Sequence, residues 1–341
     1  MGQPLHIRQG KKKLTNYVNG IHYPEDYVFE IEKVRGDEAY TSGFVDSIYT
    51  GRLKFADLEH GMKIKDGDFI KKINTDTSSN KESFYFLHIA KTSGISLQSE
   101  LKKAFVGEQN FINSLLHINE NDMLNSKLIS GHFAMYPFLL YKNNNKKING
   151  LTIIRNPIDR AISYFAFRYK LTHSVFGLQT KNLTSKNFDS FLNEEKNLTF
   201  ISNYQTKTIT SDLNTDDCSI WVNKYINGEI ARLELSAAIA FNNGFMNLKN
   251  NESSWRKSLD NFNIIGTVDK RELFLDKTSE LLKKNNYNAK LRNVVKNTSD
   301  FTNEEIKKIL TKDQIDRIIE LNQYDFEFYD FVMSKGGILE F

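Results

Sequence analysis

The feature that most constrains the fold is an apolar run that leads directly into a short polar loop and then a helical pattern. Residues 84–89 (FYFLHI) have the pattern of a strand that is buried on both faces. The small-residue turn 90–94 (AKTSG) follows, and after it apolar side chains recur at helical spacing at Leu97, Leu101, Ala104 and Phe105. A buried strand, a loop and a helix in this order form the basic unit of an α/β domain.

The same order of elements occurs twice more. Residues 151–154 (LTII) form a short strand pattern, after which Asn156 is expected as the N-cap and Pro157 as the first residue of a helix with the apolar stripe Ile158, Ile162, Phe165 and Tyr169. Residues 263–265 (NII) precede an amphipathic segment that runs from Gly266 to Leu282. Strands that alternate with helices predict an α/β domain with a mainly parallel central sheet flanked by helices. Ligands bind such sheets at the carboxyl ends of the strands.

The first 80 residues follow a different pattern. Residues 27–33 (YVFEIEK) alternate like a strand, and residues 61–70 resemble short strands joined by a turn at Asp66-Gly67. The polar stretch 73–83 is the best candidate linker. We therefore expect a small β-rich appendage over residues 1–80 and the main domain over residues 81–341.

Composition excludes several classes of protein. Hydrophobic residues make up 40% and aromatic residues 12% of the 341, which is enough for a core and excludes a disordered or collagen-like chain. The net charge of +4 falls short of a nucleic-acid footprint. No apolar run approaches the ~20 residues that span a bilayer, and no signal peptide is recognisable, so we expect a cytoplasmic protein. Its single cysteine, Cys218, allows neither an intramolecular disulfide nor a Cys-rich metal site.

The loop after the first strand has the chemistry of an anion site. Backbone N–H groups at a helix N-terminus bind anions, Lys91 adds a positive charge, and hydroxyl donors follow at Thr92, Ser93 and Ser96. The loop is not a Walker A motif, because Ala90 stands where that motif has a glycine. An ordinary strand–turn–helix with an exposed lysine would have the same residues, so the loop alone leaves both interpretations open.

Two further segments carry candidate site residues directly after apolar strands. Arg155 and Ser163 combine a guanidinium fork with a hydroxyl, which suits a phosphate monoester. An arginine that pairs with a carboxylate at a helix start explains Arg155 equally well when it is taken alone. His132 follows the strand-like residues 128–131 and is a candidate general base, although a single histidine is more often structural. The shared placement of the three segments favours one common site.

Together the three segments resemble the sulfotransferases that use 3′-phosphoadenosine 5′-phosphosulfate (PAPS), and most closely the carbohydrate branch typified by heparan sulfate 2-O- and 6-O-sulfotransferases. Residues 86–96 (FLHIAKTSGIS) are similar to the family's 5′-phosphosulfate loop, and residues 152–163 (TIIRNPIDRAIS) to its 3′-phosphate motif. Ser130-Gly-His132 is similar to the segment that supplies its base. Residues 263–269 and 324–329 resemble its C-terminal half, so the resemblance covers roughly residues 84 to 332.

The resemblance implies a P-loop-like phosphosulfate loop, PAPS as co-substrate, no metal, and a hydroxyl-bearing acceptor, expected to be a glycan. It assigns catalysis to Lys91 and His132: the histidine removes the acceptor proton, and the lysine with the loop N–H groups stabilises the leaving oxygen. The residues that it assigns to PAPS binding are Lys91, Thr92, Ser93, Gly94, Ile95, Ser96, Arg155, Ser163, Lys296 and Thr298.

The sequence departs from the family pattern at four positions. Ala90 stands where proline is usual, Ser93 where glycine is frequent, and Asn156 where aspartate is usual. Ser130 replaces the second histidine of the 2-O branch, which weakens a 2-O assignment. The Golgi members have a membrane anchor and this chain shows none, so we expect a soluble microbial or viral enzyme.

Two alternatives are kept. One is a P-loop-type kinase that uses ATP and Mg²⁺, against which the missing Walker A glycines argue. The other is an inactive module that binds a nucleotide or a glycan, against which the presence of Lys91, His132, Arg155 and Ser163 argues. Lipid, polyketide and tyrosyl-peptide acceptors also remain open.

Overall fold

In a computed structural model of the chain, the described residues are 27–28, 63–64, 81–112, 120–175, 183–213, 215–216, 218, 220, 246–247, 252–293 and 302–341. The chain divides into two compact units. One comprises residues 1–80, 107–126 and 214–245, and the other comprises residues 81–106, 127–213 and 246–341. The boundaries expected for the appendage and the main domain stay a prediction.

Two short strands are described in the N-terminal region. β1 (Tyr27–Val28) pairs antiparallel with β2 (Lys63–Ile64). The predicted turn at Asp66-Gly67 and most of the predicted linker lie outside the described residues.

The main sheet has six strands in the order β10-β9-β6-β3-β5-β4. β3 pairs in parallel with β5 and β6, β6 pairs in parallel with β9, and β10 runs antiparallel to β9. The predicted mainly parallel α/β sheet is therefore confirmed. The strand bounds are β3 Ser83–Leu87, β4 Asn110–Ile112, β5 Leu128–Gly131, β6 Ile148–Ile154, β9 Ile264–Thr267 and β10 Ile338–Glu340.

The central strand β3 is shorter than its apolar run suggests. Residues Phe84 to Leu87 are fully buried, as expected for a strand that is covered on both faces. His88 and Ile89 continue the apolar pattern but lie beyond the end of the strand, where the chain turns toward the next helix. The His88 N–H still donates to the carbonyl of Gly131, at 3.0 Å, so the first residue of the loop remains tied to β5.

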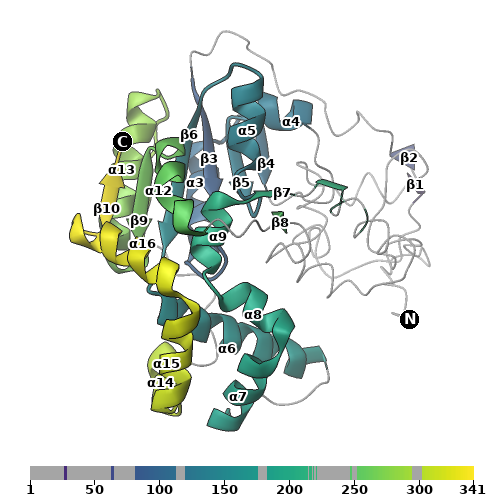
Figure 1. The fold of residues 1–341 in the computed structure, drawn as a ribbon. Coiled ribbons are helices and arrows are strands. Elements are labelled where there is room, and N and C mark those ends of the chain that lie inside the picture. The colour runs from purple at the N-terminus through teal and green to yellow at the C-terminus, as the bar shows by residue number, and fades with distance from the viewer. Residues whose placement is uncertain are drawn as a thin grey trace. The chain divides into compact units, whose positions relative to one another are not determined.

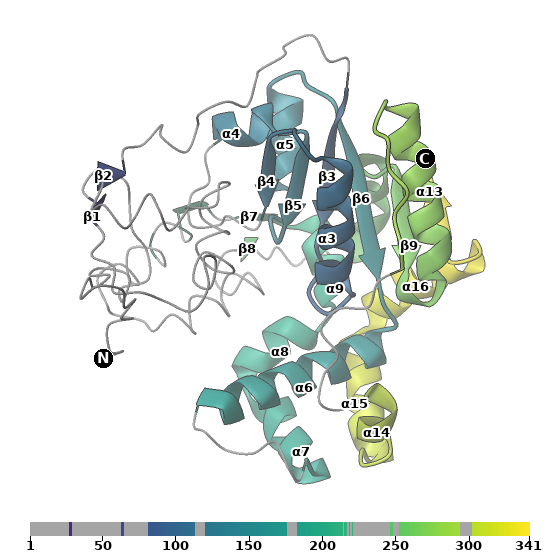
Figure 2. The same ribbon diagram turned by 180° about the vertical axis from the view of Figure 1, so that it is seen from behind.

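Helices cover both faces of this sheet. α3 (Gly94–Ala104) and α13 (Arg271–Lys284) lie on one face, and α5 (Tyr136–Asn143), α12 (Trp255–Ser258) and α16 (Gln323–Ser334) lie on the other (Figures 1 and 2). On the second face, the centroid of the buried Trp255 ring lies 4.9 Å from the ring centroid of Phe328 in α16. These aromatic contacts join helices that are far apart in the sequence.

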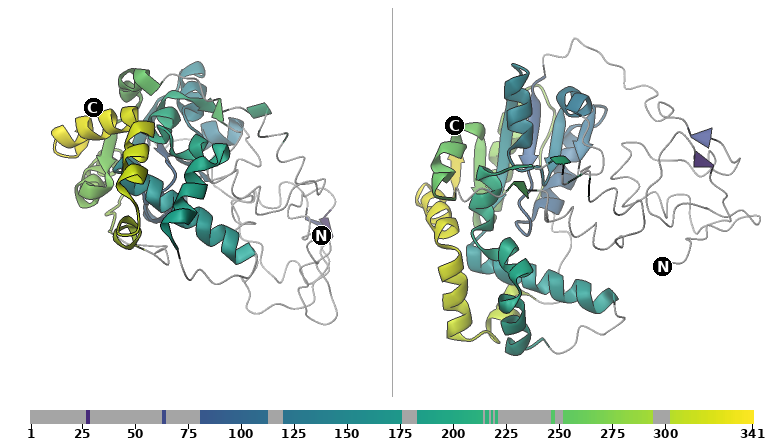
Figure 3. Two further views of the ribbon diagram at one scale, coloured as in Figure 1. Left: turned by 60° about the horizontal axis from the view of Figure 1, so that its bottom comes forward. Right: turned by 45° about the vertical axis from the view of Figure 1, so that its right-hand side comes forward.

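A group of helices extends from the end of the sheet at which β6 terminates, and it comes forward in the left view of Figure 3. Its members are α6 (Pro157–Val175), α7 (Ser185–Asn193), α8 (Glu195–Ile201), α14 (Asn303–Lys307) and α15 (Lys312–Leu321). Phe165 of α6 packs against Phe188 and Phe191 of α7.

α9 (Tyr204–Thr210) follows α8 and leads into the short antiparallel pair β7 (Asp212–Leu213) and β8 (Met246–Asn247). In the unit that contains residues 107–126, α4 (Glu120–Asn125) follows β4. Among the described residues, no helix combines the length and apolar character that a membrane span requires.

The start of α6 confirms its predicted cap, whereas its predicted apolar stripe is only partly right. The Asn156 side-chain oxygen accepts from the N–H groups of Ile158 and Asp159, at 3.0 and 3.3 Å. Ile162 and Phe165 are buried, but Ile158 is only half-buried, and Arg160 takes a fully buried position beside it. This buried position tolerates a charged side chain because Arg160 donates hydrogen bonds to the carbonyls of Phe200 and Ile201.

Candidate active site

The three segments selected from the sequence meet at one edge of the sheet. Leu87, the last residue of β3, pairs with Gly131 of β5 and with Thr152 of β6. The strands are parallel, so the residues that follow them emerge side by side. His88, His132 and Arg155 each follow one of these strands directly and therefore begin neighbouring loops, although up to 67 positions separate them in the sequence.

The loop between β3 and α3 has an unusual backbone. Lys91 and Ser93 have φ angles of 71° and 65°, in the left-handed region that favours glycine. The buried Thr92 between them donates its hydroxyl to the carbonyl of Ile89 at 2.8 Å and so braces the loop from inside. The positive φ of Ser93 explains why glycine suits this position in the family that the loop resembles.

Gly94, the first residue of α3, is required by its contact with a histidine ring. A Cβ atom at this position would lie 1.9 Å from Cδ2 and 2.1 Å from Nε2 of His88. Glycine therefore allows the helix N-terminus to approach the end of β3 closely. The next two residues differ in exposure, since Ile95 faces solvent and Ser96 is buried.

On its other side, the imidazole of His88 stacks against the ring of His132. The two ring centroids lie 4.4 Å apart with the planes inclined by 28°, and both side chains are buried. Burial lowers the pKa of His132 to about 4, although a hydrogen bond to the backbone of His88 opposes the shift. Burial and the neighbouring His132 also hold the pKa of His88 well below its usual value. Both rings are therefore neutral near pH 7, and a neutral ring is the form that can accept a proton.

Lys91 lies in a cationic environment at the same edge. Burial, followed by the charges of Arg155 and Arg160, lowers the pKa of Lys91 to about 8. Its ammonium nitrogen lies 4.7 Å from the centre of the Phe167 ring of α6. Nearby cations destabilise the charged form of a lysine, and an anion that binds beside the lysine relieves this cost. This environment therefore favours an anionic ligand.

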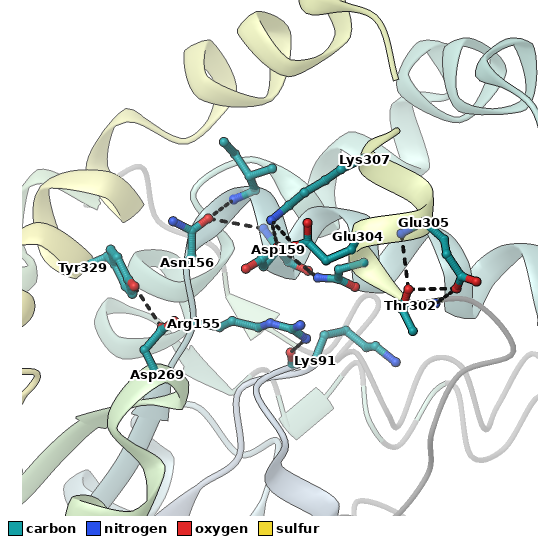
Figure 4. A network of polar contacts seen from close by, with 12 residues as sticks. Lys91, Arg155, Asn156, Asp159, Asp269, Thr302, Glu304, Glu305, Lys307 and Tyr329 are labelled. Atoms are coloured by element: carbon teal, nitrogen blue, oxygen red, sulfur yellow. Dashed lines mark hydrogen bonds and ion pairs between the residues drawn. The ribbon is translucent and has the colours of Figure 1, made fainter. Parts of the chain in front are cut away.

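Arg155 joins the two predicted phosphate-binding segments. Its Nη1 donates to the carbonyl of Lys91 at 3.3 Å, as Figure 4 shows. Burial lowers its pKa, and the charges of Asp159 and Asp269 oppose the shift. Asp269 accepts from the Tyr329 hydroxyl at 2.8 Å. The Lys91 carbonyl and the charges of Asp159 and Asp269 thus surround the guanidinium, which forms no direct ion pair with any of the described residues.

Ser163 and Arg160 lie further along α6. Ser163 is half-buried, and in the described part of the chain no hydrogen bond joins it to Arg155. Arg160 is fully buried, and its guanidinium lies 4.8 Å from the Tyr204 ring. Its Nε and Nη1 have no hydrogen-bond partner among the described residues. Arg160 therefore adds a buried positive charge that acts on Lys91, and the carboxylate of Asp325 offsets part of it.

Lys296 and Thr298 lie outside the described residues, and their predicted role over a nucleotide stays a prediction. The residues on either side are anchored to the two helices that begin at the site. The Arg292 N–H donates to Glu100 of α3 at 3.3 Å. Asn303 donates to the backbone and side chain of Asp159 in α6, and Lys307 forms an ion pair with Asp159 at 2.8 Å (Figure 4).

Sequence reasoning did not select several residues that shape the site: His88, Arg160, Gln205, Asp269, Tyr329 and Asp325. Asp269 could have been selected from the sequence, because it closely follows the apolar strand β9 at the same edge as the other candidates. Gln205 had no such signal, because it lies in a helical segment remote in sequence from every motif. Asp325 and Tyr329 lie within the segment 324–329 that was selected by resemblance, but the resemblance gave neither residue a role.

A comparison with models of protein families finds a match. Residues 77–332 match the model of a family described as "Sulfotransferase family". No curated protein matches the chain.

Proposed function

This chain belongs to the sulfotransferase family, and from that premise we propose that it transfers the sulfuryl group of PAPS to a hydroxyl of a carbohydrate. The observation that carries the proposal is the hydrogen bond between Arg155 and the Lys91 carbonyl. This bond joins Arg155, near the start of the segment that resembles the 3′-phosphate motif, to the loop that resembles the phosphosulfate loop, so one ligand with two anionic groups would reach both. The carbohydrate acceptor is supported by the resemblance of residues 86–96 and 152–163 to the carbohydrate branch.

The residues of this edge fit such a donor. PAPS carries a 5′-phosphosulfate and a 3′-phosphate, and it would supply the activated sulfuryl group. Lys91 and the N–H groups at the start of α3 would hold the 5′ end. Arg155 and Ser163 would hold the 3′-phosphate. The pKa of Lys91, which burial and the charges of Arg155 and Arg160 lower to about 8, supports a site that favours an anionic ligand.

His132 would act as the base. Its neutral ring would accept the proton of the acceptor hydroxyl while the new oxygen–sulfur bond forms. The positive charge of Lys91 would stabilise the negative charge that develops on the departing phosphate oxygen. His88 would keep the His132 ring in place through the stacked contact.

Binding and transfer assays test the proposal. Calorimetry should show that the protein binds adenosine 3′,5′-bisphosphate more tightly than ATP with Mg²⁺. Radiolabelled PAPS should then transfer sulfate to a member of a panel of glycans and small alcohols. Tighter binding of ATP, with phosphate transfer, would indicate a kinase and overturn the proposal. Bisphosphate binding without transfer to any acceptor would support an inactive module instead.

A further inference from the structure

The backbone of Arg155 is held by a single side chain from another helix. The Gln205 Oε1 atom accepts from the Arg155 N–H at 2.8 Å, and its Nε2 donates to the Arg155 carbonyl at 2.9 Å. Gln205 is fully buried in α9, 50 positions further along the chain. One amide thus satisfies both backbone polar groups of the residue that carries the guanidinium.

Arg155 needs such a partner because it lies beyond the sheet. The ladder between β6 and β9 ends at the pair Ile154 and Thr267, so no neighbouring strand pairs with the next residue of the chain. Buried N–H and carbonyl groups without partners cost free energy, and the chain would shift to find other partners. The Gln205 amide removes that freedom and fixes the direction in which the Arg155 side chain leaves the backbone.

Gln205 is itself held by Asp325 of α16. The Asp325 carboxylate accepts from the N–H of Gln205 at 3.0 Å, from the N–H of Thr206 at 2.8 Å, and from the Thr206 hydroxyl at 2.9 Å. It is fully buried, and the positive charge of Arg160 acts on it. Asp325 therefore satisfies the first N–H groups of α9, which have no partner inside the helix.

The starts of α9 and α16 are also tied to each other directly. The Asn203 side chain accepts from the N–H groups of Tyr324 and Asp325, at 3.0 and 3.3 Å. In return, Asn322 accepts from the Asn203 N–H at 3.2 Å. These reciprocal bonds make the two helix starts a rigid support for Gln205.

We propose that Gln205 is a positioning residue for Arg155, that Asp325 holds it in place, and that the two set the preference of the site for a 3′-phosphate. The inference rests on the proposed function, because it assumes that Arg155 contacts that phosphate. It adds that the selectivity of the site depends on α9 and α16, outside both sequence motifs.

The variant Gln205→Met tests the inference, because it keeps the side-chain volume and removes both hydrogen bonds. Calorimetry would compare adenosine 3′,5′-bisphosphate with adenosine 5′-monophosphate, which lacks the 3′-phosphate. We expect the affinity for the bisphosphate to fall by about tenfold and that for the monophosphate by less than about twofold. A general loss of structure would weaken both ligands, so the ratio of the two affinities is the informative quantity.

Gln314→Met is the matched control. Gln314 is also buried, accepts from the Thr311 N–H at 3.0 Å and donates to the Ser185 carbonyl at 3.0 Å. Its hydrogen-bond partners, Thr311, Ser185 and Asp189, lie outside the site, so this variant should keep the wild-type ratio even if its stability falls.

The outcomes separate the inference from the proposed function. A wild-type protein without preference for the bisphosphate would overturn the proposed function and the inference with it. A wild-type preference that Gln205→Met leaves unchanged would overturn the inference alone. If Gln205→Met does not fold, Asp325→Asn takes its place: a lower ratio supports the inference, and an unchanged ratio overturns it.

Discussion

The imidazole rings of His88 and His132 stack with their centroids 4.4 Å apart, and this contact joins the carboxyl ends of β3 and β5. The ring of His88 also lies against Gly94, so a single side chain connects the candidate base to the start of α3. Burial keeps both rings neutral near pH 7. Several measurable consequences depend on this arrangement and on the cations beside it.

Replacement of His132 by alanine should abolish transfer but not nucleotide binding. A general base contributes about 10²–10⁴-fold to the rate, so kcat should fall by at least about 100-fold. The affinity for adenosine 3′,5′-bisphosphate, measured by calorimetry, should change little, because the cationic residues remain. Substantial residual turnover would show that another group removes the acceptor proton.

The two histidines should make the protein less stable in mild acid. The folded pKa of His132 is about 4, whereas the usual value is 6.5, so between these two pH values the unfolded chain binds more protons. Stability should therefore be full above pH 6.5 and should fall toward pH 4, by about 1 kcal/mol per pH unit for one such histidine. Urea unfolding at pH 7, 6 and 5 would measure this slope, and His132→Gln should reduce it. Equal slopes in the two proteins would contradict the assignment.

Nucleotide affinity should fall at high pH as Lys91 loses its proton. The pKa of Lys91 is about 8 because of burial and the nearby Arg155 and Arg160, so its charge is present below that pH and is lost above it. We expect the bisphosphate affinity to decrease above pH 8 by up to about tenfold per pH unit. Lys91→Arg should remove this decrease, because arginine keeps its charge. A wild-type affinity that stays constant to pH 9.5 would argue against a bound anion at Lys91.

Lys91→Ala should also slow the chemical step. The loss of one group that stabilises a developing oxyanion costs about 10²–10³-fold in kcat. The comparison of kcat with the bisphosphate affinity of the same variant separates this effect from weaker binding. A turnover close to that of the wild type would remove Lys91 from the mechanism.

Two neighbouring positions in the loop should respond to substitution with opposite signs. Gly94→Ala places a methyl group against the His88 ring, and overpacking of this kind costs about 1–3 kcal/mol. Ser93→Gly relieves a left-handed conformation that costs about 1–2 kcal/mol but increases the backbone entropy lost on folding by about 0.5–1 kcal/mol, so the net gain is about 0–1.5 kcal/mol. Thermal unfolding of the two variants should therefore shift in opposite directions. A destabilised Ser93→Gly would indicate that the Ser93 side chain makes a necessary contact.

The sequence predicted the sheet and the segments that meet at its edge because that information is local. Each strand is a short apolar run, and each is followed directly by the polar residue of interest, as at Arg155 and His132. The burial of Arg160 could not be predicted in this way, because its stabilising partners are carbonyls of α8 and a ring of α9. The support of Arg155 by Gln205 depends in the same way on contacts between remote helices.

The position of Asp325 has a consequence for how fragments of such chains are interpreted. A gene product that ended before Gln323 would retain all the residues of the two segments proposed to hold the phosphosulfate and the 3′-phosphate. It would nevertheless lack the carboxylate that holds the start of α9 and, through Gln205, the backbone of Arg155. Truncated chains with both motifs intact should therefore not be counted as functional enzymes on the strength of the motifs alone.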